Sequence, residues 1–231
     1  MADYRAYIPT KNEIIDLCIA VAALTIGFSM AIVGGFSGVK NFIVVLPVAF
    51  VAILISFPLH EYMHKIVAQR FGAIAAFKRS DTGILLTIAT GFLGILFGMP
   101  GATMIYTNNF TVKEEGYVSI AGPLTNLAIF AVLFAISFIP AINSNAYFMT
   151  SLSFILFINL WLAFFNMLPL YPLDGSKVLR WNKPVYATTM AVLIALLFYI
   201  EGIGIVYSIL IVLVIAFIMS SLYRGMIFRG P

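Results

Sequence analysis

Charged residues and cysteines are scarce in this chain of 231 residues. Only 10% of the residues are charged and 62% are hydrophobic, whereas soluble domains average about 25% charged residues. This composition is typical of an integral membrane protein in contact with a lipid bilayer. The single cysteine, Cys18, excludes an intramolecular disulfide. Because no long polar stretch interrupts the apolar runs, we expect one membrane-embedded domain over residues 1–231.

Apolar runs of spanning length predict an all-α polytopic membrane protein with about six transmembrane helices. The first run, 14–33, has about 20 residues, enough to cross the ~30 Å hydrocarbon layer. A capping-box pattern, Thr-Val-Lys-Glu at 111–114, predicts the start of another helix. The remaining predicted spans begin at residue 42 and occupy 151–168, 185–200 and 203–223.

The segment 83–98 differs from these runs. It is apolar, but it has about 16 residues and contains four glycines, and the strand-like stretch 102–106 follows it. A length of this kind is short for a span. We therefore expect a re-entrant, β-hairpin-like segment rather than a seventh crossing.

The distribution of basic residues predicts the orientation in the membrane. If 83–98 folds back, twelve of the thirteen Lys and Arg residues lie on one side and Lys40 lies opposite. The positive-inside rule then places the N- and C-termini in the cytoplasm. We interpret the net charge of +4 through this uneven distribution of basic residues rather than as a sign of nucleic-acid binding, and no nucleic-acid partner is expected.

The strongest motif is His60-Glu61-Tyr62-Met63-His64, which contains both histidines of the chain. On a helix, the H-E-x-x-H spacing places two imidazoles one turn apart, where both can bind one zinc ion. Glu61 is then in position to act as a general base. The alternative is a pair of buried histidines hydrogen-bonded to neighbouring helices.

A catalytic zinc of this type takes a third protein ligand, commonly a carboxylate. Asp174 is expected at the same depth as the histidines, on the cytoplasmic side, and follows a helix end unwound by two prolines. The spacing alone leaves open that Asp174 is an ordinary turn residue before Gly175.

Three ordered motifs give this chain a resemblance to the site-2 protease family of intramembrane zinc metalloproteases. They are HEYMH, AGPLTN at 121–126 and NMLPLYPLDG at 166–175, within a core of about 42–180. The resemblance implies that Asp174 is the third zinc ligand, that 83–110 is a membrane-embedded β-hairpin, and that Asn166 lies in the substrate cleft. The chain looks like a minimal member without PDZ or CBS domains. Ser176 departs from the glycine that many members carry.

The expected function is zinc-dependent hydrolysis of a peptide bond within or near a transmembrane helix of a substrate protein, in regulated intramembrane proteolysis. Glu61 would move the proton, and Asn166 would bind the oxyanion or the substrate backbone. An interhelical hydrogen bond is the alternative for Asn166. A metal transporter and a proteolytically inactive membrane binding protein are the alternative functions.

Overall fold

The computed structural model describes residues 8–95, 99–107, 110–204, 209–210 and 213–214. Five of its helices are long and apolar enough to cross a membrane, which confirms an all-α polytopic membrane fold. Two short strands form the only sheet among the described residues. The predicted span 203–223 lies mostly outside the described residues. The helices and strands are α1 (Lys11–Ile32), the 3-10 helix η2 (Gly35–Asn41), α2 (Phe42–Arg70), β1 (Ile74–Arg79), α3 (Asp81–Phe92), β2 (Gly101–Tyr106), α4 (Val112–Ile136), α5 (Pro140–Asn143), α6 (Ala146–Asn166), α7 (Asp174–Trp181), α8 (Lys183–Glu201) and η3 (Gly202–Gly204).

Helices α1, α4 and α6 begin at residues whose side chains accept hydrogen bonds from the free backbone N–H groups of the first turn. The predicted capping box at the start of α4 is confirmed, since Thr111 and Glu114 each accept a hydrogen bond from the other's backbone N–H. Thr10 and Glu13 form the same arrangement at the start of α1. Asn145 caps α6 through its side chain. These starts depend on neighbouring residues alone.

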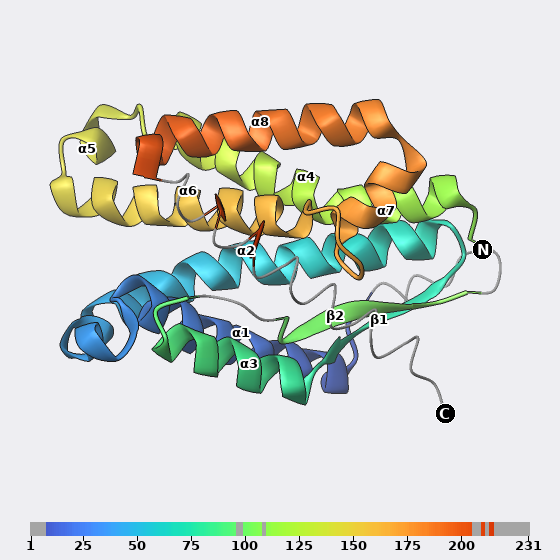
Figure 1. The fold of residues 1–231 in the computed structure, drawn as a ribbon, viewed down its shortest axis with the longest axis horizontal. Helices are drawn as coiled ribbons and strands as arrows, with labels where there is room; N and C mark the ends of the chain where they lie inside the picture. The colour runs from blue at the N-terminus through green and yellow to red at the C-terminus, as the bar shows by residue number, and fades with distance from the viewer. Residues whose placement is uncertain (1–7, 96–98, 108–109, 205–208, 211–212, 215–231) are drawn as a thin grey trace.

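Helix α2 lies in the middle of the molecule (Figure 1). It packs against α1 on one side and against α4 and α6 on the other, while α8 covers α6 and α7. Helix α3 packs along α1 at very short range, because an added Cβ at Gly91 would lie 2.4 Å from the backbone oxygen of Gly27. The apolar core between α2 and α6 includes Ile53 and Phe164, both almost fully buried.

The β-hairpin expected after the second span is present, but its strands lie outside 83–98. Most of that segment is helical, in α3, because Ser80 caps a run that can form three turns. The strand expected at 102–106 is present as β2, but its antiparallel partner is β1, which precedes α3. Lys78 and Arg79 belong to β1.

The segment between the strands nevertheless returns to its starting point. Arg79 pairs with Gly101, and the Ser80 N–H donates to the Pro100 carbonyl oxygen at 2.8 Å. The 12 residues of α3 rise about 18 Å, too little for the hydrocarbon layer. The segment between β1 and β2 therefore starts and ends at the same end of the molecule, as the sequence predicted.

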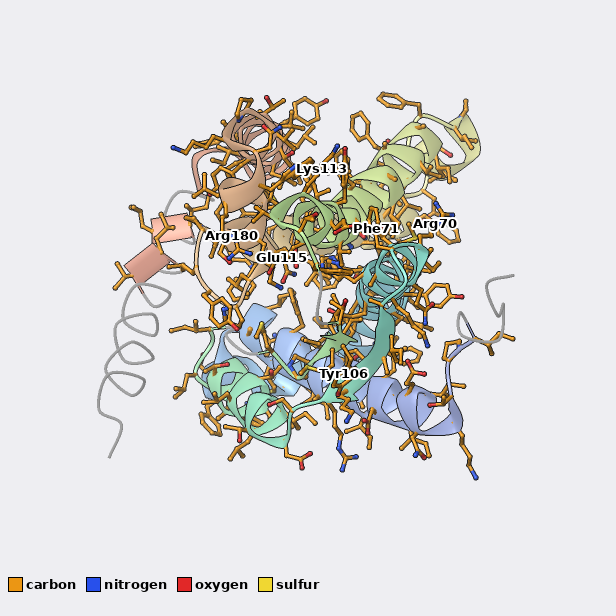
Figure 2. All side chains as sticks on the ribbon, turned by 90° about the vertical axis from the view of Figure 1, so that its right-hand side faces the viewer. Arg70, Phe71, Tyr106, Lys113, Glu115 and Arg180 are labelled. Carbon is orange, nitrogen blue, oxygen red and sulfur yellow. The ribbon has the colours of Figure 1, made fainter. Side chains whose placement is uncertain are left out.

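That end also gathers charged side chains. Figure 2 looks onto it and shows Arg70, Lys113, Glu115 and Arg180 together. They come from the end of α2, the start of α4 and α7. The ion pair between Arg180 and Glu115 joins α7 to α4. The carboxyl end of α2, with its histidine motif, therefore points toward the charged end of the bundle.

Candidate metal centre

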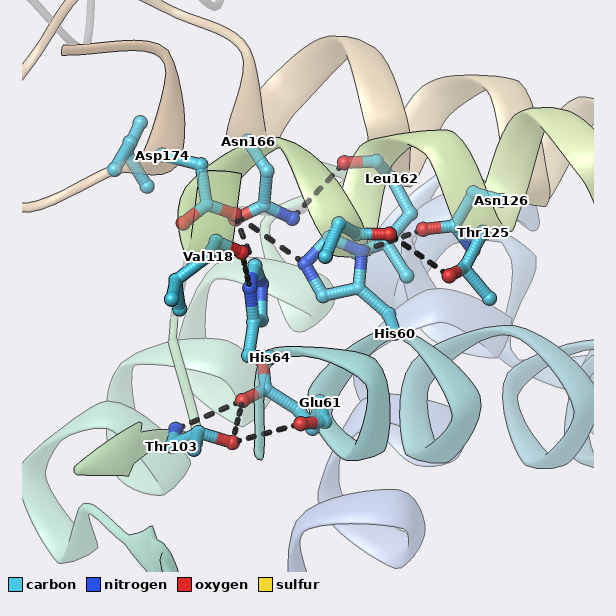
Figure 3. A network of polar contacts seen from close by, with 12 residues as sticks. His60, Glu61, His64, Thr103, Val118, Thr125, Asn126, Leu162, Asn166 and Asp174 are labelled. Atoms are coloured by element: carbon cyan, nitrogen blue, oxygen red, sulfur yellow. Dashed lines mark hydrogen bonds and ion pairs between the residues drawn. The ribbon is translucent and has the colours of Figure 1, made fainter. Parts of the chain in front are cut away.

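Three buried side chains converge near the carboxyl end of α2 (Figure 3). His60 and His64 lie one turn apart on α2, and Asp174 is the first residue of α7. Asp174 Oδ2 lies 3.5 Å from His60 Nε2 and 3.1 Å from His64 Nε2. One ligand atom from each residue lies within 4.8 Å of the others. The structure thus brings together the three residues that the sequence predicted as a metal site.

Helix α4 fixes the orientation of both imidazole rings. His60 Nδ1 donates to Asn126 Oδ1 at 2.5 Å, and His64 Nδ1 donates to the Val118 carbonyl oxygen at 2.7 Å. A proton held on Nδ1 leaves Nε2 as the ligand atom, the arrangement common for metal-binding histidines. Asn126 is itself held by Asn159 Oδ1 on α6, at 3.1 Å. The Asn126 side chain therefore links α4 to both α2 and α6.

Asp174 reaches the histidines because α7 is held tightly against α4 and the end of α6. An added Cβ at Gly116 of α4 would lie 2.4 Å from the Trp181 ring, and one at Gly175 would lie 2.0 Å from the Met167 carbonyl oxygen. Val178 is fully buried between these elements. Ser176, the departure from the family pattern, donates its hydroxyl to the Leu173 carbonyl oxygen at 2.8 Å and leaves the turn intact.

The electrostatics of Asp174 suit an ionised ligand. Burial of the carboxyl group by itself raises its pKa, but the charge of a protonated His64 imidazole and hydrogen bonds from both rings outweigh this effect. The pKa of Asp174 is consequently lowered below its usual range. A cation held at the Nε2 atoms, a proton or a metal ion, therefore keeps the Asp174 carboxyl group ionised.

The distances from Asp174 to the two histidines fit a zinc ion. Ligands at about 2.0–2.1 Å from tetrahedral zinc lie about 3.3 Å from one another, close to the two distances measured here. Space for an ion exists because residue 122 is glycine. An added Cβ there would lie 2.4 Å from His64 Nε2 and 2.5 Å from His60 Nε2. The residues present therefore fit the metal.

Glu61 faces away from this cluster. Its Oε2 accepts a hydrogen bond from the Thr103 backbone N–H at 2.8 Å and lies 2.8 Å from the Thr103 hydroxyl. Thr103 lies in the middle of β2. No sequence pattern marked Thr103, because its position depends on the folding back of the segment between the strands.

A cavity of about 690 Å³ adjoins the cluster. Its lining includes Glu61, His64, Asn166 and Asp174, together with β2 from Gly101 to Ile105. The Asn166 amide group donates to the Leu162 carbonyl oxygen within its own helix, at 2.9 Å. This bond lies within α6, whereas the alternative prediction was a bond between helices.

Comparison with known proteins identifies the family. A protein of Methanocaldococcus jannaschii with the name "Putative zinc metalloprotease MJ0611" is 38% identical over 192 residues, which cover 82% of this chain and 95% of the relative. This chain belongs to the site-2 protease family of zinc metalloproteases. No family model and no solved structure matches it.

Two further members of the family are longer than this chain. "Zinc metalloprotease MJ0392" of the same organism is 31% identical over 133 residues, or 58% of this chain and 33% of the relative. "Putative zinc metalloprotease Rip2" of Mycobacterium tuberculosis is 30% identical over 139 residues, or 55% of this chain and 54% of the relative. The chain thus spans about a third and about half of these two relatives.

Proposed function

We propose that this protein is an intramembrane zinc metalloprotease that hydrolyses a peptide bond within or near a transmembrane helix of a substrate protein. The observation that carries the proposal is the convergence of His60, His64 and Asp174 beside a cavity that Glu61 also lines. The two rings present Nε2, and Asp174 presents Oδ2, to one point. A donor set of two histidines and a carboxylate is the usual one for a proteolytic zinc.

The roles of the residues follow from their chemistry. Bound zinc would polarise the scissile carbonyl group and favour ionisation of the attacking water. Glu61 takes a proton from that water and delivers it to the amine that leaves. His60, His64 and Asp174 hold the metal, and the Asn126 and Val118 oxygens hold the two rings in their ligand orientation. Asn166, on the cavity wall, is in position to donate to the oxyanion or to the substrate backbone.

The cavity favours a substrate in an extended conformation. A helical peptide bond is shielded by the helix's own hydrogen bonds, so the substrate has to unwind before attack. Strand β2 lines the cavity along most of its length. An unwound segment can add to it as a third strand, which satisfies the backbone groups of both chains.

We also propose that lipid surrounds the long helices and that the site faces the cytoplasm, with both termini on that side. Large apolar side chains such as Ile43 and Tyr199 are exposed on α2 and α8, 71% and 72% respectively, as lipid contact requires. The charged end shared by α2, α4 and α7 is the end with the histidine motif (Figure 2). Basic residues prefer the cytoplasmic side.

Glu61→Gln tests the hydrolytic mechanism. The substitution keeps the size and polarity of the side chain but removes its basicity. We expect retained zinc and a loss of cleavage of a model transmembrane substrate by about 10²-fold or more. Asp174→Asn should weaken zinc binding as well as activity.

Four measurements on matched, reconstituted samples separate the candidate functions: zinc content, cleavage rate, zinc flux and substrate binding. Zinc content and cleavage rate distinguish Glu61→Gln from Asp174→Asn, and zinc flux into vesicles tests transport. Equal cleavage by Glu61→Gln and the parent at equal zinc loading would show that the mechanism is wrong. Zinc flux without cleavage would establish the transporter, and substrate binding with neither would establish the inactive binding protein.

A further inference from the structure

In the two-stranded sheet, the pattern of hydrogen-bonded and non-hydrogen-bonded residue pairs identifies which backbone groups face outward. Phe77 of β1 is directly opposite Thr103 of β2. Neither N–H is used between the strands, because Phe77 N donates to Glu13 Oε1 at 3.1 Å and Thr103 N donates to Glu61 Oε2 at 2.8 Å. In an antiparallel ladder, bonded and non-bonded pairs alternate. Gly101, Thr103 and Ile105 therefore present their backbone groups along the outer edge of β2.

The outer edge of β1 is closed by α1. Glu13 is buried, accepts from the Phe77 N–H, and is paired with Lys65 Nζ at 2.8 Å. Further along the strand, Asp16 Oδ2 lies 3.5 Å from the Arg79 N–H. Acidic side chains of one helix thus occupy the positions that an added strand would need.

The outer edge of β2 lines the cavity, and Glu61 is bound at its centre. The Thr103 backbone N–H and hydroxyl both lie 2.8 Å from the same carboxylate oxygen. The hydroxyl also lies 3.0 Å from the Glu61 carbonyl oxygen, so its single proton serves one acceptor at a time. Hydrogen bonds to a carboxylate are about twice as strong as neutral ones.

We propose that Thr103 is a positioning residue that holds Glu61 on the edge of β2 until a substrate strand takes its place. This inference rests on the proposed proteolysis by strand addition. A strand that pairs along β2 has to accept from the Thr103 N–H, which Glu61 occupies in the free protein. Pairing therefore displaces the Glu61 carboxylate toward the scissile bond. Substrate binding and delivery of the base become one exchange of hydrogen bonds.

Four zinc-loaded, cleavage-deficient proteins test the exchange: Glu61→Gln, Glu61→Ala, and each of these with Thr103→Val. The glutamine keeps an acceptor for Thr103, whereas alanine leaves the strand edge free. The probe is a fluorescent synthetic peptide with one membrane-spanning segment, titrated in detergent micelles. Glu61→Ala should bind it about fivefold more tightly than Glu61→Gln, the weight of one neutral hydrogen bond.

The two Thr103→Val proteins supply the control for side effects of the substitutions. Valine keeps the shape and the backbone N–H of Thr103 but lacks its hydroxyl. Thr103→Val should tighten binding in the Glu61→Gln protein and leave it unchanged in the Glu61→Ala protein. Equal affinities for all four proteins, or no binding by any, would overturn the proposal.

Cleavage by otherwise unchanged protein gives an independent readout. Thr103→Val should lower KM by about threefold, because it removes one of the hydrogen bonds that keep Glu61 on the strand edge in competition with the substrate. Thr103→Ser keeps the hydroxyl and should restore the parental KM. A purely structural role would instead reduce kcat or zinc content. A raised KM in Thr103→Val would overturn the exchange.

The two hypotheses fail separately. If the parent cleaves the probe but the four affinities show no coupling, the exchange is wrong and the protease stands. If the parent does not cleave it but the coupling is present, the exchange stands and the proteolytic function is wrong.

Discussion

At the scale of single residues, the proposed metal centre depends on groups that are not its ligands. Asn126 and the Val118 carbonyl oxygen bind Nδ1 of the two histidines and so determine which nitrogen faces Asp174. Gly122 lies on the same helix and leaves the space next to both Nε2 atoms open. Helix α4 therefore orients the ligands and makes room for the ion.

Gly122→Ala should reduce zinc binding. The added methyl group would lie 2.4–2.5 Å from both Nε2 atoms, close to where zinc–nitrogen bonds of about 2.0–2.1 Å would place the ion. Alanine favours a helix over glycine, so the loss does not arise from a weaker α4. Elemental analysis should show at least a tenfold lower zinc content than the parent, comparable with His60→Ala.

Gly204→Ala is the matched control, because an added Cβ at Gly204 meets nothing within 4 Å. It should keep the parental zinc content. A full complement of zinc in Gly122→Ala would contradict the position assigned to the ion.

The residues of the proposed metal site could be found in the sequence, whereas the residues around them could not. His60 and His64 share a helix face through a fixed spacing, and Asp174 follows a proline-broken helix end. Thr103 is 42 residues from Glu61 and carries no local signal. Its contact exists only because the chain returns after α3, and pairing at such a distance depends on the whole fold.

At the scale of elements, the same contrast separates helices from strands. The capping box predicted the start of α4 because Thr111 and Glu114 are three residues apart. Strand β1 was missed because its alternation is short and its partner follows a helix. A buried ion pair holds this strand in place, since Glu13 of α1 binds both Lys65 of α2 and the Phe77 N–H.

Lys65→Met should destabilise the protein. The substitution leaves the Glu13 carboxylate buried without its counter-charge, and removal of one partner of a buried pair costs about 3–5 kcal/mol. The methionine is similar in length and apolar. Thermal unfolding in detergent should show a Tm about 6–20 °C lower than that of the parent.

The double variant Glu13→Gln with Lys65→Met removes both charges and should recover most of the lost Tm. If Lys65→Met alone unfolds at the parental Tm, the ion pair does not hold β1 against α1 and α2.

At the scale of the whole molecule, the distribution of charged side chains and the path of the chain indicate the same orientation in the membrane. The segment from Asp81 to Pro100 starts and ends at one end of the bundle, where the Ser80 N–H meets the Pro100 carbonyl oxygen. The same end carries the charged side chains of α2, α4 and α7 (Figure 2). Lys40, in the connection η2 at the opposite end of α2, is the one basic residue that the charge count puts on the other side.

Single cysteines should report this topology in membrane vesicles. In a Cys18→Ala background, Asp81→Cys and Lys113→Cys flank the returning segment, and both positions are exposed. A membrane-impermeant maleimide should label both from the cytoplasmic side, because α3 is too short to cross. Lys40→Cys, also exposed, should be labelled from the other side and shows that the vesicles are sealed. Labelling of positions 81 and 113 from opposite sides would require a seventh crossing. The metal centre would then lie between segments that the membrane separates, and the proposed arrangement would be wrong.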